Sequence, residues 1–333
     1  ADLSAYLDNA HNAIASGPIL VDAFLDGAIE IDVDALSDGK TVFIGGILEH
    51  IEPVGIHSGD SACSIPPYSL TESQLDCIKA STIKLAQALC VCGFMNVQYA
   101  LKDDTLYVIE VNPRASRTVP FVAKSTGNSL ASIAAKLVVG TPLASLALKP
   151  ASPRHYSIKE VVFPFGRFDH VDSLLGPEMQ STGEAMGIDP VFGVAFFKAQ
   201  EAVGNPIPLN GTLLLSVTDG DKPKIIQAVQ CFLDHDFIIY ATKNTARFLN
   251  KMLKTDKIKE TADCLALLDQ VKIDLILNTT DPIQRPVSFQ LRRRAIMNRL
   301  SYVTTVRGFH AMATAVDAMR DAYDVHALDD IIA

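Results

Sequence analysis

The sequence has no long apolar run and no basic tract, and each absence excludes a class of protein. No apolar stretch approaches the roughly 20 residues that a helix needs to cross a bilayer, so we expect no membrane partner. Acidic residues outnumber basic ones, 38 against 29, and the formal net charge is −9. A chain with this charge balance is a poor candidate for binding nucleic acid or an anionic membrane surface.

Cysteine pairs are also missing. The six cysteines include no C-x-x-C motif, and Cys90 and Cys92 stand too close in sequence for a relaxed disulfide. This usage predicts free thiols in a reducing compartment, and we expect a cytoplasmic protein. The first residues contain Asp2 and Asp8 and do not resemble a signal peptide. Because Ala1 opens the chain inside a helix-like pattern, we expect that it is not the natural start.

Motifs of hydrolytic enzymes are absent too. The sequence contains no G-x-S-x-G nucleophile elbow, and its eight histidines show no zinc-ligand spacing such as H-E-x-x-H. His57 belongs to no evident Ser–His–Asp arrangement. The sequence therefore argues against a nucleophilic hydrolase and against a zinc enzyme.

The chain does have the composition of a globular protein, with 48% hydrophobic and 20% charged residues over 333 positions. This length suggests about two domains. The first, residues 1–203, mixes strand and helix signals and is predicted to have an α+β fold. Its clearest helix is predicted over residues 71–93, with Thr71 and Gln74 as a capping-box pair and Gly93 at the C′ position. The other elements predicted there are strands at residues 18–25, 29–36, 41–52, 94–101 and 106–111 and a helix at 128–139.

A second domain, residues 206–333, alternates short apolar strands with helix-like segments, whereas residues 154–203 carry no clear assignment. This alternation predicts an α/β fold with a doubly wound parallel sheet. The strands are predicted at residues 213–217, 237–241, 273–278 and 302–306, and the helices at 222–233, 245–253, 289–300 and 309–319.

Polar residues gather where the strands of this second domain are predicted to end, at residues 216–222, 242–245 and 278–280. Open α/β sheets bind ligands at that edge, where helix N-termini favour phosphates. Ordinary helix capping explains the same residues equally well. Three consecutive arginines at 292–294 are most simply the solvated side of a helix.

The sharpest chemical signal lies in a predicted hairpin. Asn96 and Gln98 share one face of its first strand, and Glu110 and Asn112 share one face of its second, because side chains alternate along a strand. A three-residue loop at 103–105 would place Gln98 opposite Glu110 and Asn96 opposite Asn112. The side-chain oxygens would then converge, as they do around Mg²⁺ held with nucleotide phosphates.

Two arginines, Arg114 and Arg117, follow this hairpin. They would neutralise charge on a transferring phosphoryl group, which needs positioning and electrostatic stabilisation more than covalent chemistry. The competing interpretation is a polar, solvent-facing side of an ordinary hairpin, and spacing alone favours it.

Two further stretches are candidates for nucleotide contacts. Residues 55–61, G-I-H-S-G-D-S, form a turn-rich segment that would wrap a nucleotide or simply form a surface loop. Glu30, Asp32 and Asp34 alternate with apolar residues and form one polar strand face, which would hold a ribose or meet water.

Together these motifs resemble the large subunit of carbamoyl-phosphate synthases. Residues 46–52 and 55–61 match the family's E-H-I-E…H-S-G-D-S block. Residues 95–98 and 109–121 match its M-N-[VI]-Q and E-V-N-P-R motifs, and residues 176–187 match its G-P-E-M-x-S-T-G-E block. E-x-N-P-R alone occurs across ATP-grasp enzymes, whereas the full ordered set is specific.

The resemblance implies a fold and an activity. Residues 1–203 would be the C-terminal portion of the second ATP-grasp domain, and residues 206–333 a regulatory domain resembling methylglyoxal synthase. The family's second ATP-grasp half uses ATP to phosphorylate carbamate to carbamoyl phosphate, for arginine and pyrimidine biosynthesis. A glutaminase small subunit is the implied partner, and the full-length protein is expected to be an oligomer.

Site residues follow from the same resemblance. Arg114 and Arg117 would assist the phosphoryl group, and Gln98, Glu110 and Asn112 would hold Mg²⁺ or Mn²⁺. The nucleotide would be held by Ala23, Leu25, Glu30, Gly55, Ile56, His57 and Ser58, together with Gln98 and Glu110.

Two effector sites are implied as well. A nucleotide phosphate would be held by Lys222, Thr242, Thr245, Asn278 and Thr280. An ornithine pocket would include Glu52, Asp60, Glu160, Tyr302 and Thr304. The sequence departs from the family here, because the T-H-G-T turn reads T-K-N-T at residues 242–245 and Val303 replaces a frequent aspartate.

The ATP-grasp glycine-rich loop and its preceding subdomain are expected upstream of Ala1. We therefore expect this chain alone to bind ATP weakly and to make no carbamoyl phosphate. Two alternatives remain open: another ATP-grasp ligase such as a biotin carboxylase, and a fragment that only senses a phosphorylated metabolite through residues 206–333.

Overall fold

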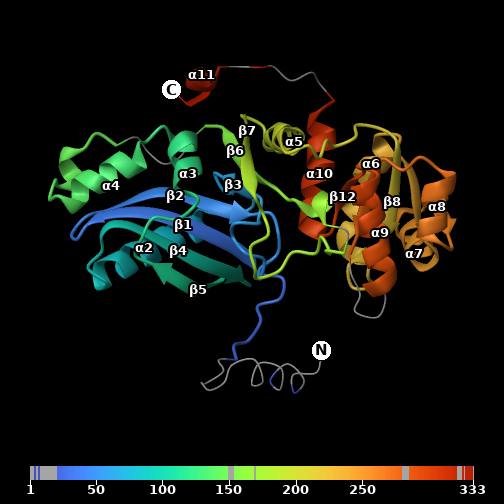
Figure 1. Ribbon diagram of the computed structural model, residues 1–333, viewed down its shortest axis with the longest axis horizontal. Helices are drawn as coiled ribbons and strands as arrows, with labels where there is room; N and C mark the ends of the chain where they lie inside the picture. The colour runs from blue at the N-terminus through green and yellow to red at the C-terminus, as the bar shows by residue number, and fades with distance from the viewer. Residues whose placement is uncertain are drawn as a thin grey trace.

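The protein contains two β-sheets joined through a pair of helices (Figure 1). The computed structural model describes residues 21–148, 154–168, 170–279, 285–320 and 327–332, together with positions 4, 7 and 325. Within those residues, no helix combines the length and the apolar character that crossing a membrane would require.

The first sheet has seven strands in the order β5-β4-β1-β2-β3-β6-β7, and every neighbouring pair is antiparallel. Its strands are β1 (Ile29–Asp38), β2 (Val42–His50), β3 (Cys63–Ile65), β4 (Cys92–Lys102), β5 (Thr105–Asn112), β6 (Tyr156–Val162) and β7 (Gly183–Asp189). Its helices are α2 (Glu72–Ala88), α3 (Val119–Thr126), α4 (Leu130–Val138) and α5 (Phe192–Ala202).

Helices cover both faces of this sheet (Figure 1). Ile31, Val33 and Ala35 of β1 share a buried cluster with residues of α2. Leu36 belongs to another cluster, with residues of α3 and α4. Because side chains alternate, Glu30, Asp32 and Asp34 point to the same side as Leu36 and away from α2. The sheet therefore carries a polar stripe on the face that α3 and α4 cover only in part.

Helix α2 confirms the predicted start and corrects the predicted end. The reciprocal Thr71–Gln74 capping box is present. The helix stops at Ala88, and the residue with left-handed backbone after it is Cys90, with φ of 50°. Gly93 instead lies inside β4, because pairing with β1 begins at Cys92. Strand pairing ends the helix earlier than its apolar periodicity predicted.

Strand β2 runs without a break through the two glycines that interrupt its sequence pattern. Gly45 is the extra residue at a bulge opposite β1, because Asp34 pairs with Gly46 while Ala35 pairs with Ile44. A Cβ on Gly46 would lie 2.6 Å from Val122 Cγ1, so glycine lets α3 approach the sheet closely. The prediction of a strand at residues 18–25 was wrong for residues 21–25, which form no strand. Residues 18–20 lie outside the described part of the chain.

The second sheet has five parallel strands in the order β10-β9-β8-β11-β12. Its strands are β8 (Thr212–Ser216), β9 (Ile238–Thr242), β10 (Lys259–Thr261), β11 (Leu275–Asn278) and β12 (Ser301–Val303). Its helices are α6 (Ile226–Asp234), α7 (Lys243–Leu253), α8 (Cys264–Gln270), α9 (Arg285–Met297) and α10 (Val306–Ala318). A terminal segment, α11, spans Leu328–Ile332.

This order confirms a doubly wound parallel sheet, in which the order of the strands along the sheet reverses between β8 and β11. The sequence pattern missed β10 and α8, which are short. It was wrong about the arginine run on α9, because Arg292 and Arg293 are buried at 1% and 9% exposure. They face the segment that precedes β7 rather than solvent, bonding Asp172 and the Phe165 carbonyl.

Helices α5 and α10 join the two sheets (Figure 1). Helix α5 packs on β6 and β7 of the first sheet, and α10 packs on α5 and on α6 of the second. A Cβ on Gly193 of α5 would lie 2.5 Å from the Thr314 carbonyl oxygen of α10. The two helices can approach this closely only because position 193 lacks a side chain.

Candidate active site

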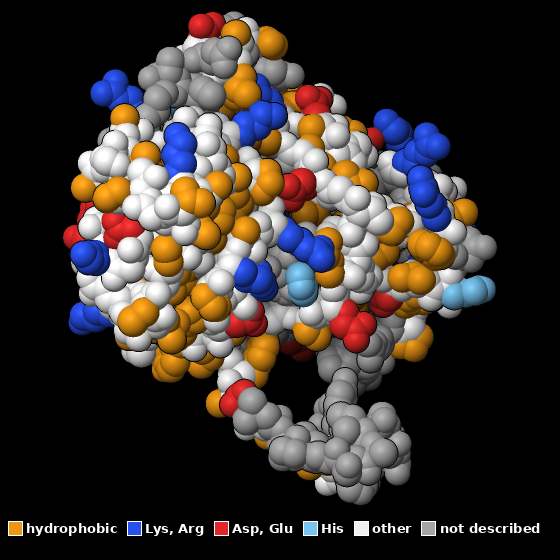
Figure 2. Space-filling view, turned by 60° about the vertical axis from the view of Figure 1, so that its left-hand side comes forward, with side chains coloured by type: hydrophobic (Ala, Val, Ile, Leu, Met, Phe, Trp, Pro, Cys, Tyr) orange, Lys and Arg blue, Asp and Glu red, His pale blue; other side chains and the backbone are white. Residues whose placement is uncertain are grey.

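A cleft of about 1030 Å³ opens beside the β4–β5 hairpin. Figure 2 shows a face on which basic, acidic and histidine side chains gather near the middle. Of the residues predicted to touch nucleotide or phosphoryl group, eleven line this one cleft: Ala23, Leu25, Glu30, Gly55, Ile56, His57, Ser58, Gln98, Glu110, Arg114 and Arg117. They come from four separate chain segments, so the fold itself brings them together.

The β4–β5 hairpin has the predicted pairing beside the cleft, but its turn differs from the predicted one. Asn96 pairs with Asn112 and Gln98 pairs with Glu110. The turn contains two residues rather than three, Asp103 and Asp104, both with positive φ as in a type I′ turn. This shorter turn would shift the register by one residue, and a bulge beside Gln98 restores it.

Side-chain oxygens converge on this hairpin. The amide of Asn112 donates to the carboxylate of Glu110, and Glu110 is exposed at the mouth of the cleft. Gln98 is partly buried beside them. Carboxylate and carbonyl oxygens are the ligands of hard cations, so this donor set fits Mg²⁺ or Mn²⁺. Asn96 instead uses its amide to bond Asp34 and acts as a support.

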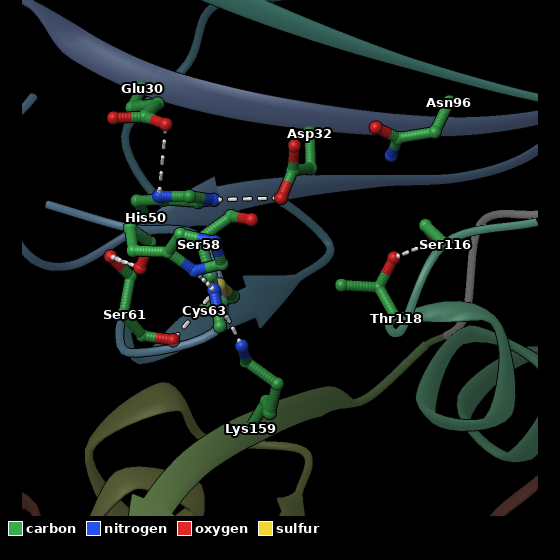
Figure 3. A network of polar contacts seen from close by, with 12 residues as sticks. Glu30, Asp32, His50, Ser58, Ser61, Cys63, Asn96, Ser116, Thr118 and Lys159 are labelled. Carbon is green, nitrogen blue, oxygen red and sulfur yellow. Dashed lines mark hydrogen bonds and ion pairs between the residues drawn. The ribbon is translucent and has the colours of Figure 1, made fainter. Parts of the chain in front are cut away.

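The acidic stripe on β1 is buried rather than solvated. Asp32 is 1% exposed, and its Oδ2 lies 3.1 Å from His50 Nε2 (Figure 3). The Nδ1 of His50 lies 3.9 Å from a Glu30 carboxylate oxygen. Burial opposes a charged imidazole, but the Cys63 sulphur and Asp32 outweigh it and raise the pKa of His50. Burial also raises the pKa of Glu30, because it disfavours the charged carboxylate.

Two buried atoms of these residues, Asp32 Oδ1 and His50 Nδ1, have no hydrogen-bond partner within the described protein. Asp32 Oδ1 is buried and unpaired, and Asp32 lines the cleft. An unsatisfied buried carboxylate oxygen is costly unless a ligand or water completes it. The cleft is therefore suited to a ligand that offers a donor or a cation at this point.

Asp34 fixes the loop that carries the two arginines. Its carboxylate accepts hydrogen bonds from Asn96, from Ser116 at 2.7 Å and from Thr118. Burial nevertheless raises the pKa of Asp34. The loop reaches across the cleft, where the Arg117 guanidinium contacts the Met179 sulphur. A buried carboxylate thus sets the position of Arg117.

The segment at residues 55–61 is tied to the segment before β7. Asp60 is fully buried, and its carboxylate accepts from the backbone N–H groups of Gln180 and Ser181 at 2.7 and 2.9 Å. The N–H of His57 donates to the Gly176 carbonyl at 2.9 Å. Two motifs that are more than a hundred residues apart in sequence therefore form one wall of the cleft.

Lys159 is a site residue that sequence reasoning missed. It is 1% exposed, lines the cleft from β6, and donates from Nζ to the Ser58 carbonyl at 2.9 Å (Figure 3). Burial would lower its pKa, but surrounding acidic groups outweigh burial and raise it. A charged residue within the apolar strand Y-S-I-K-E-V-V was the signal that could have found it. His50 was missed as well, although it stands inside the E-H-I-E block.

A second cavity, of about 320 Å³, lies between the two sheets. It is lined by four of the five residues expected in an ornithine pocket, Glu52, Glu160, Tyr302 and Thr304. Burial raises the pKa of both Glu52 and Glu160, and the nearby Glu52 carboxylate raises that of Glu160 further. The fifth residue, Asp60, does not line this cavity, because its carboxylate holds the 180–181 backbone.

The residues expected to hold an effector phosphate stand at the carboxyl ends of parallel strands. Lys222 follows β8 and bonds Asp219, and Thr242 donates to Thr245 at 2.9 Å where β9 meets α7. Asn278 ends β11, and its side-chain Oδ1 accepts from Arg292 at 2.7 Å. Thr280 lies outside the described residues.

Several known proteins are similar in sequence to this chain. The family model described as "Carbamoyl-phosphate synthase L chain, ATP binding domain" matches residues 2–146. A relative from Aquifex aeolicus, named "Carbamoyl phosphate synthase large chain, C-terminal section", is 42% identical over 361 residues, which cover 99% of this chain and 67% of that protein. The chain belongs to the carbamoyl phosphate synthase large chain family. The resemblance carried by the sequence motifs is thereby confirmed.

Other members of this family are much longer. The large chain of Methanocorpusculum labreanum is 44% identical over 96% of this chain and 31% of its own length. That of Mesorhizobium japonicum is 47% identical over 92% of this chain and 27% of its own. The chain thus spans about a third of the length of such relatives. Among solved structures, a biotin carboxylase domain of a single-chain bacterial carboxylase aligns at TM-score 0.47 and 14% identity over 60% of this chain and 52% of that one, too weak a likeness to bear on function.

Proposed function

We propose that this chain is the part of a glutamine-dependent carbamoyl-phosphate synthase in which ATP phosphorylates carbamate to carbamoyl phosphate, for arginine and pyrimidine biosynthesis. The observation that carries the proposal is the hairpin pairing of Gln98 with Glu110 and Asn96 with Asn112, at the mouth of a cleft lined by the 55–58 segment. Family membership supports this reading over a biotin carboxylase.

Each part of the cleft has a role in this proposal. Gln98, Glu110 and Asn112 would hold Mg²⁺ or Mn²⁺, which would neutralise nucleotide phosphates when bound. The carboxylate of Glu30 and the backbone of residues 55–58 would hold the nucleoside. Arg114 and Arg117 would stabilise charge on the transferring phosphoryl group. Asp34 would keep the arginine loop in place through Ser116 and Thr118.

The two effector sites remain part of the proposal. The cavity lined by Glu52, Glu160, Tyr302 and Thr304 would take ornithine or a similar cation, because two buried carboxyl groups face it. Residues 206–333 would form the domain resembling methylglyoxal synthase, with Lys222, Thr242, Thr245, Asn278 and Thr280 at a nucleotide phosphate.

The protein would act in the cytoplasm together with a partner chain. The six cysteines are free, as expected for a protein of the reducing cytoplasm. A glutaminase small subunit would be the partner chain, and the full-length protein would form an oligomer. The metabolite-sensor alternative would be favoured if an effector bound tightly to residues 206–333 and nucleotide failed to bind beside Glu110. The biotin-carboxylase alternative would be favoured if nucleotide bound there but carbamoyl phosphate was not a substrate.

The first test is Mg²⁺-dependent nucleotide binding, measured by calorimetry with ADP. Glu110→Gln should weaken binding by at least about tenfold, since losing residues that support a metal costs 10–100-fold in affinity. Glu178→Gln is the matched control, because it removes the same charge from an exposed residue outside the cleft lining. Equal affinities in the two variants would contradict the proposed metal site.

The second test is ATP formation from ADP and carbamoyl phosphate, in this chain and in a version extended upstream through a complete ATP-grasp domain. Activity in the extended protein alone would support the assigned reaction and the need for the upstream part. Activity in neither would shift the assignment to another substrate, and activity in both would show that the upstream part is dispensable.

A further inference from the structure

Three side chains of metal-binding type meet in the part of the protein built on the second sheet (the second unit, residues 206–333). None of them lines the cleft. Cys231 and His235 are four residues apart at the end of α6, and Asp317 lies near the end of α10. One ligand atom from each lies within 4.8 Å of the other two. The spacing of four residues places Cys231 and His235 on the same side of the helix end.

The geometry points to a site for a zinc-class divalent cation held by the Cys231 sulphur, the His235 imidazole and the Asp317 carboxylate. Sulphur, imidazole nitrogen and carboxylate oxygen are the three donor types that Zn²⁺ binds in proteins. Three protein ligands with water in the fourth position are a common zinc coordination. His235 Nε2 and Asp317 Oδ1 are 3.1 Å apart, close enough to bind one ion together.

A positive group already occupies this position. The Arg320 Nε lies 3.1 Å from His235 Nε2 and 3.3 Å from Asp317 Oδ1. Its side chain is 57% exposed, so it can turn into solvent at little cost. The donors are thus arranged for a cation, and the guanidinium is the competitor that a metal ion displaces.

Binding also replaces a proton. The Cys231 thiol donates a hydrogen bond to the Ala313 carbonyl at 3.4 Å. The metal binds the thiolate, so the thiol proton passes to solvent and affinity falls as pH is lowered. The bound ion would connect α6 to α10, the helix that packs against α5. It would therefore stabilise the second unit where it meets the first.

The test uses Co²⁺ as a spectroscopic stand-in for Zn²⁺, titrated into the untagged full chain after treatment with a chelator. One equivalent should produce a thiolate-to-cobalt charge-transfer band that Zn²⁺ abolishes, and Zn²⁺ should raise the Tm. If the unmodified chain shows no charge-transfer band with Co²⁺, the proposal is wrong, whatever the variants show.

Four variants locate the site. Cys231→Ser should abolish the band, whereas Cys77→Ser, at an exposed cysteine on α2, should keep it. Asp317→Asn should weaken Co²⁺ binding about tenfold, and Arg320→Gln should strengthen it about tenfold, within the range known for residues that surround a metal. A band that persists in Cys231→Ser, or an affinity unchanged or lowered in Arg320→Gln, would contradict the assigned ligands.

Discussion

At the scale of single residues, the cavity between the sheets holds two carboxyl groups that burial keeps from ionising freely. Glu160 accepts a hydrogen bond from Gln200 at 2.6 Å, and Glu52 accepts one from the Ala62 N–H at 2.6 Å. Neither contact offsets the loss of hydration, and burial raises the pKa of Glu160 to about 8. The folded protein therefore binds protons here that the unfolded chain releases.

This difference predicts a pH dependence of stability. An unfolded glutamate ionises near pH 4.5, so the free energy of unfolding should fall as pH rises from 4.5 toward about 8. Glu160→Gln keeps the neutral form, so it should match the original protein at pH 5 and exceed it in stability at pH 8. Urea unfolding at both pH values measures the difference, with Glu178→Gln as an exposed control. Equal loss of stability in Glu160→Gln would contradict a retained proton on this residue.

At the scale of an element, α9 attaches the second sheet to the segment that leads into the cleft. Arg292 donates to both carboxylate oxygens of Asp172, at 2.8 and 2.6 Å, and to the side-chain Oδ1 of Asn278. Burial alone would raise the pKa of Asp172, but Arg292 lowers it. The buried ion pair between Arg292 and Asp172 therefore holds α9 against the segment that precedes β7.

Three adjacent arginines allow this attachment to be tested. Arg292→Gln should lower the free energy of unfolding by about 3 kcal/mol, the lower end for breaking a buried pair, because Asp172 keeps 27% exposure. Arg294→Gln is the control on the same helix, and its half-exposed pair with Asp269 should contribute about 0–1 kcal/mol. Urea unfolding measures both. Similar losses would indicate that burial of Arg292 does not decide its contribution.

At the scale of the whole molecule, the two sheets depend on the close contact of α5 with α10. The buried cluster around Phe196 and Phe309 is continuous from the first unit into the second. Arg307 of α10 adds polar contacts, donating to Glu49 at 2.8 Å and to Tyr68 at 2.7 Å. The sheets therefore share one core through these helices.

Gly193→Ala tests this dependence. The added Cβ would meet a backbone oxygen of Thr314 at 2.5 Å, and α5 and α10 would have to move apart. We expect a loss of about 1–3 kcal/mol in the free energy of unfolding, the range for overpacking a core. Gly176→Ala is the control, because no atom lies within 4 Å of its added Cβ. Equal unfolding midpoints in urea would show that the helix contact has room to adjust.

Sequence reasoning went furthest where the signal was local. The capping box at Thr71 was predicted from a short-range pattern. The pairing of Gln98 with Glu110 was predicted as well, although the three-residue loop assumed for it was wrong and a bulge restores the register. It failed where distant segments decide the outcome. Arg292 was taken for a surface residue because its partner, Asp172, lies 120 positions away. Lys159 was missed because only the fold places its Nζ beside the Ser58 carbonyl.

The amino-acid sequence by itself determined the family, the alternation that builds a parallel sheet, and the oxygen-bearing residues of the hairpin, because motifs and strand periodicity are properties of neighbouring residues. Tertiary structure alone decided that eleven of the predicted contact residues line one cleft. It also decided that burial raises the pKa of two carboxyl groups between the sheets, and that Cys231 and His235 meet Asp317. Burial and contact between segments distant in sequence cause these properties, and neither is encoded in any single stretch of the chain.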